Sequence, residues 1–383
     1  MIKFLHLADL HLGASPAFLD HLADQRYKDY LNAFERAVDY AIRPENQIDF
    51  VIIAGDFFDS PHPSKEVIRF SINQFKRLRQ AKIPVTLTPG NHDGISYPRC
   101  VYKDPDYGLR EYINIVDSPN IKHVLHSEFH GEEVYFYGMA WDFNNSNPPF
   151  DNFKRQNNDG YHIAIAHGSV IGGLFSDAYS RDIPLDLKNL ANTGMDYIAL
   201  GHIHSYQLNK AGSIPVVYPG TLESCRFSPG EEGDRFLVVV TLDKDHDPAI
   251  ERIKWNRKTY LNVKLDVGKL LIDSQKELID HILKQYQGEN NIVKIELVGD
   301  SACLINKDKL LSRLFGNFFW LSIEDNTFVF NNEIVENWSR EDTIRGLYIR
   351  NLQDLLENTE SIDKKNLINL ALKLAVLSFE KSK

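Results

Sequence analysis

Phe50-Val51-Ile52-Ile53-Ala54-Gly55-Asp56 joins five consecutive apolar residues to a glycine and a carboxylate. Such an uninterrupted apolar run is typical of a strand that is covered on both faces. The neighbouring segments fit this architecture, because strands predicted at 3–8 and 84–88 alternate with helices predicted at 24–42 and from Ser64 to about residue 80. The sequence therefore predicts an α/β fold in which helices flank the strands.

Five short polar motifs punctuate the chain, and four of them directly follow a predicted strand. Ligand sites of open α/β sheets lie at the carboxyl ends of strands, so we expect these motifs to meet in space. Asp9 and His11 are two positions apart, as are His202 and His204, and in an extended chain that spacing puts both side chains on one face. Later strands are predicted at 134–138, 162–166, 197–200, 216–218 and 236–242, and the motifs are Asp9-Leu10-His11, Gly55-Asp56, Gly90-Asn91-His92-Asp93, His167-Gly168 and Gly201-His202-Ile203-His204.

The motifs together offer two carboxylates, one amide and four imidazoles as metal ligands, with one imidazole, that of His92, to spare. Asp56 is the natural bridge between two ions, because a carboxylate has two oxygens and the charge to hold two cations together. Oxygen and imidazole ligands without thiolate suit two Mn²⁺ ions, with Mg²⁺ or another divalent ion as the alternative. Two metals clamp the attacking and leaving oxygens of a phosphate ester, so the sequence predicts phosphoester hydrolysis. The candidate ligands are Asp9, His11, Asp56, Asn91, His167, His202 and His204.

Two residues beside these ligands are candidates for a catalytic role. His92 directly follows Asn91, and a protonated imidazole there can stabilise the phosphoryl oxygens or protonate the leaving alkoxide. Asp59 is predicted either to hold His92 in the right tautomer or to be a solvated turn residue. His62 either lines the site or belongs to the following loop, and the loop is the favoured placement.

Composition narrows the class of protein. The 383 residues include 43 Lys and Arg against 53 Asp and Glu, so the formal net charge of −10 does not fit a strongly basic, free-standing nucleic-acid binder. The cysteines Cys100, Cys225 and Cys303 lie far apart and predict neither disulfides nor a zinc site. No apolar run is long enough for a membrane span. The candidate ligands Asp9 and His11 directly follow the first predicted strand, so cleavage of a signal peptide would remove part of the site. We therefore expect a cytoplasmic protein.

The last third of the chain predicts two further parts. Strands at 261–267, 292–298 and 318–323 alternate with a helix opened by the capping box Ser274-Gln275-Lys276-Glu277 and with one at 307–315, which makes a compact β-α-β-α-β module. We therefore expect a main domain at 1–255, this module within 256–335, and a helical tail at 336–383.

The tail at 336–383 has more apolar side chains than two helices packed only on each other can bury. Ser339-Arg340-Glu341-Asp342 predicts a second capping box, and the helix that follows has an apolar stripe. Residues 367–377 then form a helix that is apolar almost all round, and such a helix must be buried by something. The stripe comprises Ile344, Leu347, Tyr348, Leu352, Leu355 and Leu356.

The motif series resembles that of the calcineurin-like metallophosphoesterase superfamily over residues 2–245. Within it the chain is similar to the SbcD family of DNA repair exonucleases, on the strength of Phe4–Gly13, Gly201–His204, Tyr218-Pro219-Gly220-Thr221 and the small module. The resemblance implies a four-layer metallophosphoesterase β-sandwich flanked by helices, with His92 as the transition-state histidine. It also implies one metal held by Asp9, His11, Asp56 and His204, and the other by Asp56, Asn91, His167 and His202.

The same resemblance implies partners and an activity. The small module is expected to be a DNA-capping domain, the tail to dock on an SbcC-like, SMC-type ATPase, and the chain to form a homodimer. The implied function is a Mn²⁺-dependent nuclease that acts on DNA ends in repair as a double-strand exonuclease, and an additional single-strand endonuclease activity stays open. Two alternatives stay open: a small-molecule or cyclic-nucleotide phosphoesterase with the same core ligands, and a DNA-end-binding scaffold whose site is inactive.

Overall fold

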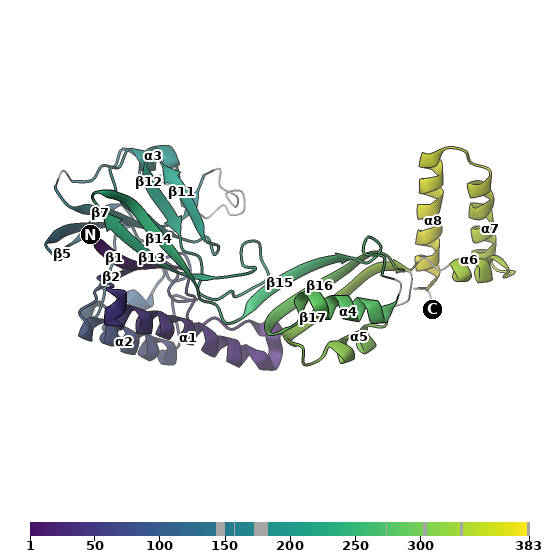
Figure 1. Cartoon of the computed structure of the whole chain (residues 1–383), viewed down its shortest axis with the longest axis horizontal. Helices are drawn as coiled ribbons and strands as arrows, with labels where there is room; N and C mark the ends of the chain where they lie inside the picture. The colour runs from purple at the N-terminus through teal and green to yellow at the C-terminus, as the bar shows by residue number, and fades with distance from the viewer. Residues whose placement is uncertain are drawn as a thin grey trace. The chain divides into compact units, whose positions relative to one another are not determined.

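The computed structural model describes residues 1–142, 150–156, 158–171, 183–272, 274–301, 305–329 and 332–380. The chain divides into two compact units, Met1–Tyr260 and Leu261–Lys383 (Figure 1). Among the described residues, no helix has the length and apolar character that a membrane crossing needs.

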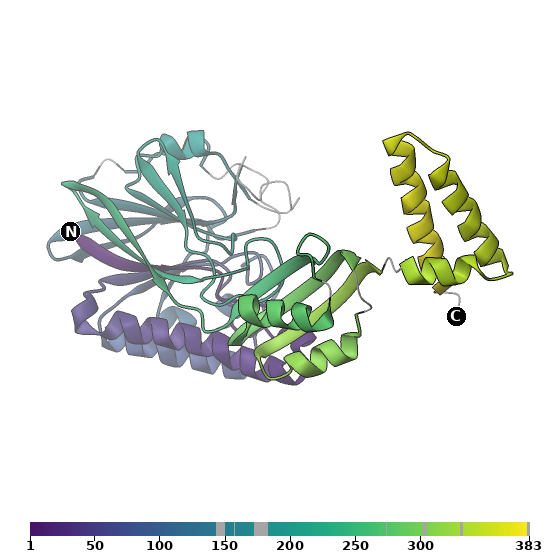
Figure 2. The ribbon, with the colours of Figure 1, turned by 45° about the vertical axis from the view of Figure 1, so that its right-hand side comes forward.

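The first unit contains two six-stranded sheets. In the first sheet the strand order is β14-β13-β1-β2-β3-β4, with β1 to β4 parallel and β13 antiparallel to β1. Helices α1 (Ala23–Ile42) and α2 (Lys65–Gln80) pack side by side along one face of this sheet (Figure 2). The strands are β1 (Ile2–Leu7), β2 (Phe50–Ala54), β3 (Val85–Thr88), β4 (Asn114–Ile115), β13 (Phe236–Asp243) and β14 (His246–Lys254).

The second sheet has the order β11-β12-β10-β7-β6-β5, in which the four inner strands are parallel and the two edges antiparallel. Its strands are β5 (Lys122–Phe129), β6 (Glu132–Gly138), β7 (Tyr161–His167), β10 (Tyr197–Gly201), β11 (Gln207–Ala211) and β12 (Ile214–Tyr218). Smaller elements complete the unit: the paired strands β8 (Ser169–Val170) and β9 (Pro184–Leu185), helix α3 (Leu187–Ala191), and 3-10 turns at Ala17–Leu22, Pro44–Asn46, Val101–Lys103 and Leu109–Glu111.

Strand β2 shows why the two sheets pack face to face. All of its residues are buried, and alternate side chains enter different cores. Val51 and Ile53 pack against the helical layer, whereas Phe50 and Ile52 pack between the sheets, where the Phe50 ring stacks on Phe4 with centroids 4.7 Å apart. The prediction of a doubly covered strand in a helix-flanked sandwich is therefore confirmed.

The start of α2 is as predicted, but three of the longer strands in this unit are not anticipated by the sequence. Ser64 caps α2, since its Oγ accepts a hydrogen bond from the Val67 N–H at 3.3 Å. The strands β5, β11 and β14 are all antiparallel edge strands, and many of their side chains are exposed. An edge strand needs no continuous apolar run, so the pattern that reveals the central strands is missing there.

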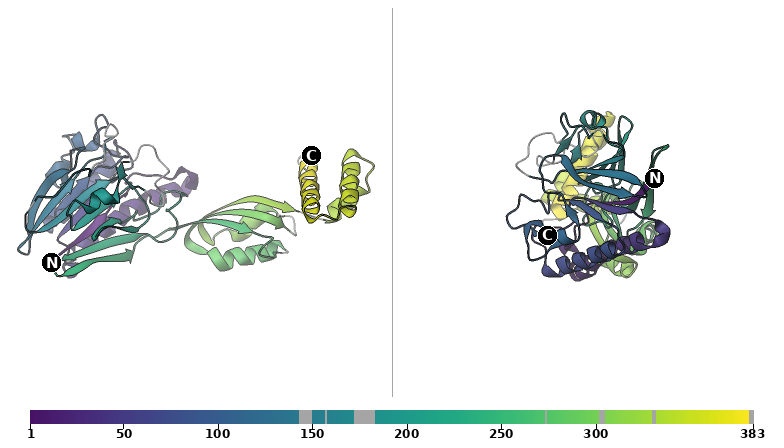
Figure 3. Two further views of the ribbon diagram at one scale, coloured as in Figure 1. Left: turned by 90° about the horizontal axis from the view of Figure 1, so that it is seen from above. Right: turned by 90° about the vertical axis from the view of Figure 1, so that its left-hand side faces the viewer.

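The second unit begins with the expected β-α-β-α-β module. Its sheet has the order β15-β16-β17, with β16 and β17 parallel, and helices α4 and α5 lie together on one face (Figure 3). The helix start predicted at Ser274 is confirmed, because Ser274 Oγ accepts a hydrogen bond from the Glu277 N–H at 3.3 Å. The elements are β15 (Thr259–Asp266), α4 (Gln275–Tyr286), β16 (Gly288–Ser301), α5 (Lys307–Leu314) and β17 (Phe318–Val329).

The tail consists of three helices, α6 (Asn332–Ser339), α7 (Ile344–Glu357) and α8 (Ile362–Glu380). The capping box predicted at Ser339 is wrong: Ser339 ends α6, and α7 is capped by Thr343, whose Oγ1 accepts from the Gly346 N–H at 3.2 Å. The small core shared by the helices contains Val335, Trp338, Ile349, Leu372 and Val376.

The apolar stripe predicted on α7 is largely not the face that packs. Ile349 is fully buried, whereas Ile344 and Leu347 of the stripe are exposed, because the helix turns its other side toward α6 and α8. The boundary between the two compact units falls after Tyr260, and the three-part division with a role for each part stays a prediction.

Candidate metal centre

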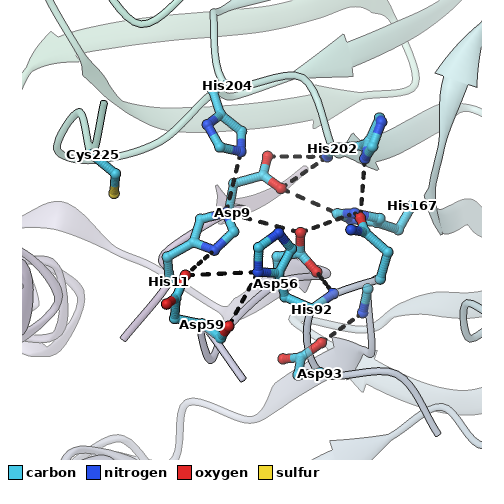
Figure 4. Close-up of polar contacts among 12 residues, drawn as sticks. Asp9, His11, Asp56, Asp59, His92, Asp93, His167, His202, His204 and Cys225 are labelled. Carbon is cyan, nitrogen blue, oxygen red and sulfur yellow. Dashed lines mark hydrogen bonds and ion pairs between the residues drawn. The ribbon is translucent and has the colours of Figure 1, made fainter. Parts of the chain in front are cut away.

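The polar motifs converge at one end of the sandwich, where strands of both sheets finish (Figure 4). The first sheet contributes the residues after β1, β2 and β3, and the second sheet contributes the end of β7 and the residues after β10. The ends of parallel strands lie at the same edge of a sheet, so five separate segments meet there, as expected. The residues brought together are Asp9, His11, Asp56, Asn91, His92, His167, His202 and His204.

The backbone around these residues is strained. The φ angle is 53° at Asp9, 44° at His11, 48° at Asp56 and 102° at His202, so all four residues have positive φ. Such conformations cost non-glycine residues on the order of 1–3 kcal/mol each. The expectation of an extended chain with alternate side chains on one face is therefore wrong at Asp9 and His202. Their side chains reach the site because the chain turns sharply as it leaves the sheet.

One half of the cluster gathers around His11 and His204. Their Nε2 atoms lie 3.2 Å apart, and His11 Nε2 lies 3.9 Å from Oδ2 of Asp56. Ligand atoms of Asp9, His11 and His204 all fall within 4.8 Å of one another. These residues belong to the set that the motif resemblance implies for one metal.

The other half gathers around the amide oxygen of Asn91. That oxygen lies 2.9 Å from Nε2 of His167 and 3.1 Å from Nδ1 of His202. Oδ2 of Asp56 is 3.3 Å from His167 Nε2, so the same carboxylate oxygen faces both halves. Asp56 therefore occupies the position that a bridging ligand requires.

The outer nitrogens of three histidines decide which inner atoms can bind a metal. His167 Nδ1 contacts the carbonyl of Ala54 at 3.0 Å, and a carbonyl can only accept, so Nδ1 carries the hydrogen. In the same way His11 Nδ1 contacts Asp59 Oδ1 at 3.2 Å and His204 Nδ1 contacts Glu231 Oε1 at 2.6 Å. In the neutral rings each Nε2 then presents a lone pair to the interior of the site.

This donor set fits divalent cations. The Nε2 lone pairs of His11 and His204 point at each other, and that of His167 points at two oxygens, so each arrangement repels unless a proton or a cation lies between the atoms. Nitrogen and oxygen donors without thiolate are those of Mn²⁺, Mg²⁺ and Zn²⁺ sites. The outer hydrogen bonds are the usual support of metal-binding histidines.

The charges of the site are mutually dependent. Burial opposes ionisation of Asp56, but the adjacent His167, together with His11 and His92, holds the pKa of Asp56 well below its usual range. Burial also opposes the charged form of His167, yet the Asp56 carboxylate raises the pKa of His167 to about 9. Without a metal, a proton on His167 therefore supplies the positive charge that the buried carboxylates need.

His92 differs from the fully buried candidate ligands Asp9, His11, Asp56 and His167 because 32% of its side chain is exposed. Its Nδ1 contacts the backbone carbonyl of Asp59 at 3.1 Å, whereas the Asp59 carboxylate is 3.7 Å away and bonds to His11 instead. Asp59 thus orients His92 through its backbone and His11 through its side chain. His62 is exposed in the loop that follows, where its N–H bonds to Ser60 Oγ.

Two buried carboxylates that support the site were not assigned a role from sequence. Asp93 accepts hydrogen bonds from the N–H groups of Gly90 and Phe58 and from the Tyr102 hydroxyl, so it ties the loops after β2 and β3 together, and burial raises its pKa. The motif that contains Asp93 signals its importance, but Glu231 lies in an unremarkable loop and no local pattern reveals it.

Glycine at two positions permits the close packing of these segments. A Cβ at Gly201 would lie 1.7 Å from the carbonyl oxygen of Ala54, so no other residue lets β10 approach β2. A Cβ at Gly90 would lie 2.2 Å from Oδ1 of Asp56 and would displace the central carboxylate.

The two-sheet fold and the partly buried Asp, His and Asn cluster at its strand ends define a metal-dependent phosphoesterase. Residues 2–206 match the family model for calcineurin-like phosphoesterases, which is more than half of the chain. The chain belongs to this family, as its motifs indicated, and divalent metal ions are its cofactor.

Comparison with individual proteins finds relatives named for DNA repair. The chain is 30% identical over 259 residues to the uncharacterized metallophosphoesterase YhaO of Bacillus subtilis, covering 63% of this chain and 58% of that protein. It is 29% identical over 285 residues to the DNA double-strand break repair protein Mre11 of Aeropyrum pernix, covering 70% and 64%. It is 24% identical over 400 residues to the SbcD component of the SbcCD nuclease of Staphylococcus epidermidis, covering 97% and 99%.

These alignments differ in extent: the chain spans less than two thirds of the length of the first two relatives. Among solved structures, a dimetal phosphatase from Danio rerio is similar over 66% of this chain and 96% of that one, with 12% identity and a TM-score of 0.38.

Proposed function

We propose that this metallophosphoesterase is a DNA nuclease that hydrolyses phosphodiester bonds at DNA ends during repair. The observation that carries the proposal is the alignment with the SbcD component of the SbcCD nuclease, which extends over 97% of this chain and 99% of that protein and so includes the second unit. A phosphoesterase of small molecules has no need of a β-α-β-α-β module and a helical tail. The two units together therefore favour a polymeric substrate.

We assign the ligands by the two halves of the cluster. One Mn²⁺ is held by Asp9, His11, Asp56 and His204, and the other by Asp56, Asn91, His167 and His202, an assignment supported by the distances between their donor atoms. When bound, the pair of ions supplies positive charge that stabilises the oxygens of the phosphodiester during in-line displacement.

His92 has a separate task in this mechanism. The Asp59 carbonyl holds the hydrogen on Nδ1 of His92, so Nε2 of the partly exposed ring is the atom left to meet the substrate. In the protonated ring, Nε2 donates to a phosphoryl oxygen and passes its proton to the leaving alkoxide. Because His92 is not needed to hold a metal, its loss should remove activity and leave metal binding in place.

The second unit is assigned to the partners of the nuclease. We propose that the β-α-β-α-β module contacts DNA, that the chain acts as a homodimer, and that the tail docks on the coiled coil of an SMC-type ATPase. Apolar side chains on the outer face of α7 support the docking, since Ile344 is 85% exposed, Leu347 54%, Tyr348 46% and Leu355 54%. An apolar helix face is what a partner helix covers.

The first test is cleavage of end-labelled linear duplex DNA, mixed with a closed circle, in Mn²⁺ and in chelator. We expect loss of the linear DNA alone, and only with metal. His92→Ala should reduce this cleavage about 10²- to 10⁴-fold. His62→Ala, a histidine change in the neighbouring exposed loop, is the matched control and should cleave normally.

Other outcomes would select a different function. Hydrolysis of a chromogenic phosphodiester with both DNAs spared would favour a small-molecule phosphoesterase. Binding of fewer than two Mn²⁺ ions, together with no hydrolysis of either substrate, would favour a DNA-end-binding scaffold. Wild-type turnover by His92→Ala would contradict the role given to His92.

A further inference from the structure

Glu231 is a buried carboxylate whose oxygens are directed at a metal ligand rather than at the core. Its side chain is 1% exposed and lies in the loop after β12. Oε1 contacts Nδ1 of His204 at 2.6 Å and accepts from Nε of Arg226 at 3.0 Å. Oε2 accepts from the backbone N–H of Cys225 at 2.6 Å, so both oxygens are held in place.

We propose that Glu231 is a positioning residue that fixes the tautomer and the orientation of His204, so that Nε2 of the ring faces a metal. The proposal rests on the two-metal site proposed above and adds a residue that the motifs do not contain. An ionised carboxylate can only accept a hydrogen bond, so the contact requires the hydrogen of His204 to be on Nδ1. A carboxylate partner also makes the opposite nitrogen a stronger donor to a cation.

The surroundings of Glu231 agree with this role, because the Cys225 N–H and the Arg226 Nε both donate to its buried carboxylate. The other two histidines with an outer hydrogen bond, His167 and His11, have partners that are either uncharged or more exposed to solvent. His167 donates to the neutral carbonyl of Ala54, and His11 contacts the carboxylate of Asp59, whose side chain is 42% exposed.

A network of backbone contacts keeps Glu231 and His204 at a constant separation. The Arg235 guanidinium donates to the carbonyl of His204 at 2.8 Å and to the carbonyl of Gly230 at 2.7 Å, which joins the two loops. Ser224 Oγ donates to the Glu231 carbonyl at 2.5 Å. The carboxylate therefore has little freedom to leave the imidazole.

A buried ion pair connects the loop after β12, which contains Glu231, to helix α1. Arg26 of α1 donates to Oε2 of Glu223 at 3.1 Å and to the carbonyl of Ser224 at 3.0 Å, and both charged side chains are buried. The neighbouring residues of the loop are thus anchored independently of any metal. Replacing the Glu231 carboxylate should therefore leave the loop in place, although it changes the hydrogen bonds of the Cys225 N–H and of Arg226 as well as that of His204.

The test is a Mn²⁺ titration of the full chain after chelation, in which free Mn²⁺ is followed by electron paramagnetic resonance. The wild type should bind two ions. In Glu231→Gln, whose amide oxygen can still accept from His204, one ion should bind about tenfold more weakly, and in Glu231→Ala up to about 100-fold more weakly. The other ion, held without His204, should keep its affinity.

Two comparisons separate positioning from general structure. Glu232→Gln makes the same change at an exposed neighbour and should bind two ions as the wild type does. The midpoint of thermal unfolding in chelator should be unchanged in Glu231→Gln. Equal weakening of both ions, parallel loss of thermal stability, or unchanged affinity in Glu231→Ala would overturn the proposal. A wild type that binds fewer than two ions would instead refute the two-metal site itself.

Discussion

At the scale of single residues, the partner of a side chain decides its chemistry more than its burial does. His6 and His167 are both buried. His6 contacts the Tyr197 hydroxyl at 2.9 Å, and burial lowers its pKa to about 3. His167 lies beside the Asp56 carboxylate, and its pKa moves the opposite way. Both histidines lie in strands, and the tertiary contacts place one beside a tyrosine hydroxyl in the core and the other beside a buried carboxylate.

His6 predicts a pH dependence of stability that is independent of the metal. Its pKa is lower in the folded chain than the ordinary value of 6.5, so below that value the unfolded chain binds more protons. The stability that neutral His6 provides is therefore complete above 6.5 and is lost as the pH falls toward about 3. In chelator, the urea midpoint of the wild type should fall more between about pH 7 and about pH 5 than that of His6→Gln. The same fall in both proteins would contradict this account.

At the scale of elements, the ends of strands matter more than their interiors. The continuous apolar run of β2 holds the strand between two layers, and that placement brings Asp56 to the point where both sheets end. In the tail, by contrast, the sequence pattern of a helix does not predict how the helix packs. The periodicity of α7 predicts a helix, but a helix with apolar residues on more than one side does not reveal which side packs.

The exposed apolar face of α7 predicts binding of a partner ATPase. Leu347→Glu combined with Tyr348→Glu should abolish pull-down of a co-expressed SMC-type ATPase, because charges would enter an interface that excludes water. The fold should persist, since Leu347 lies outside the small core of the tail and Tyr348 meets it only through an edge contact with the Phe379 ring. Glu357→Lys, an exposed charge change on the same helix, is the control and should leave pull-down intact. Retention of the ATPase by the double variant would refute docking through this face.

At the scale of the whole molecule, all the proposed ligands lie in one compact unit. They fall between Asp9 and His204, within Met1–Tyr260, so metal binding and folding of that unit are linked. The second unit has its own core, built from α4, α5 and three strands, and contains no proposed ligand. The two units should therefore respond differently to metal removal.

Calorimetry of the full chain in Mn²⁺ and in chelator tests this linkage. Metal at 100 times its dissociation constant stabilises the folded state by about 2.7 kcal/mol, so the transition of the first unit should move to higher temperature. The transition of the second unit should not move. Asp56→Asn, which removes the proposed bridge, should abolish the shift. An equal shift of every transition would mean that the units do not unfold separately.

Much of this architecture is present in local sequence patterns. Continuous apolar runs locate the central strands, Ser64 and Ser274 mark helix starts, and the order of the five motifs predicts which donors meet. These features can be predicted from the sequence because periodicity, capping and the ends of strands depend on residues that are close together in the chain. The resemblance of the motif series to calcineurin-like metallophosphoesterases likewise needs no coordinates, and the match to the family model bears it out.

Other features depend on contacts between distant residues and were set by tertiary structure alone. Edge strands β5, β11 and β14 lack a continuous apolar signal because one side of each is open to solvent. The Asp59 carboxylate lies 3.2 Å from His11 and 3.7 Å from His92, and residues 48 and 33 positions away in the chain are brought to it only by the fold. Glu231 meets His204 across 27 residues of chain, and no periodicity in sequence encodes a contact that only the folding of two loops creates.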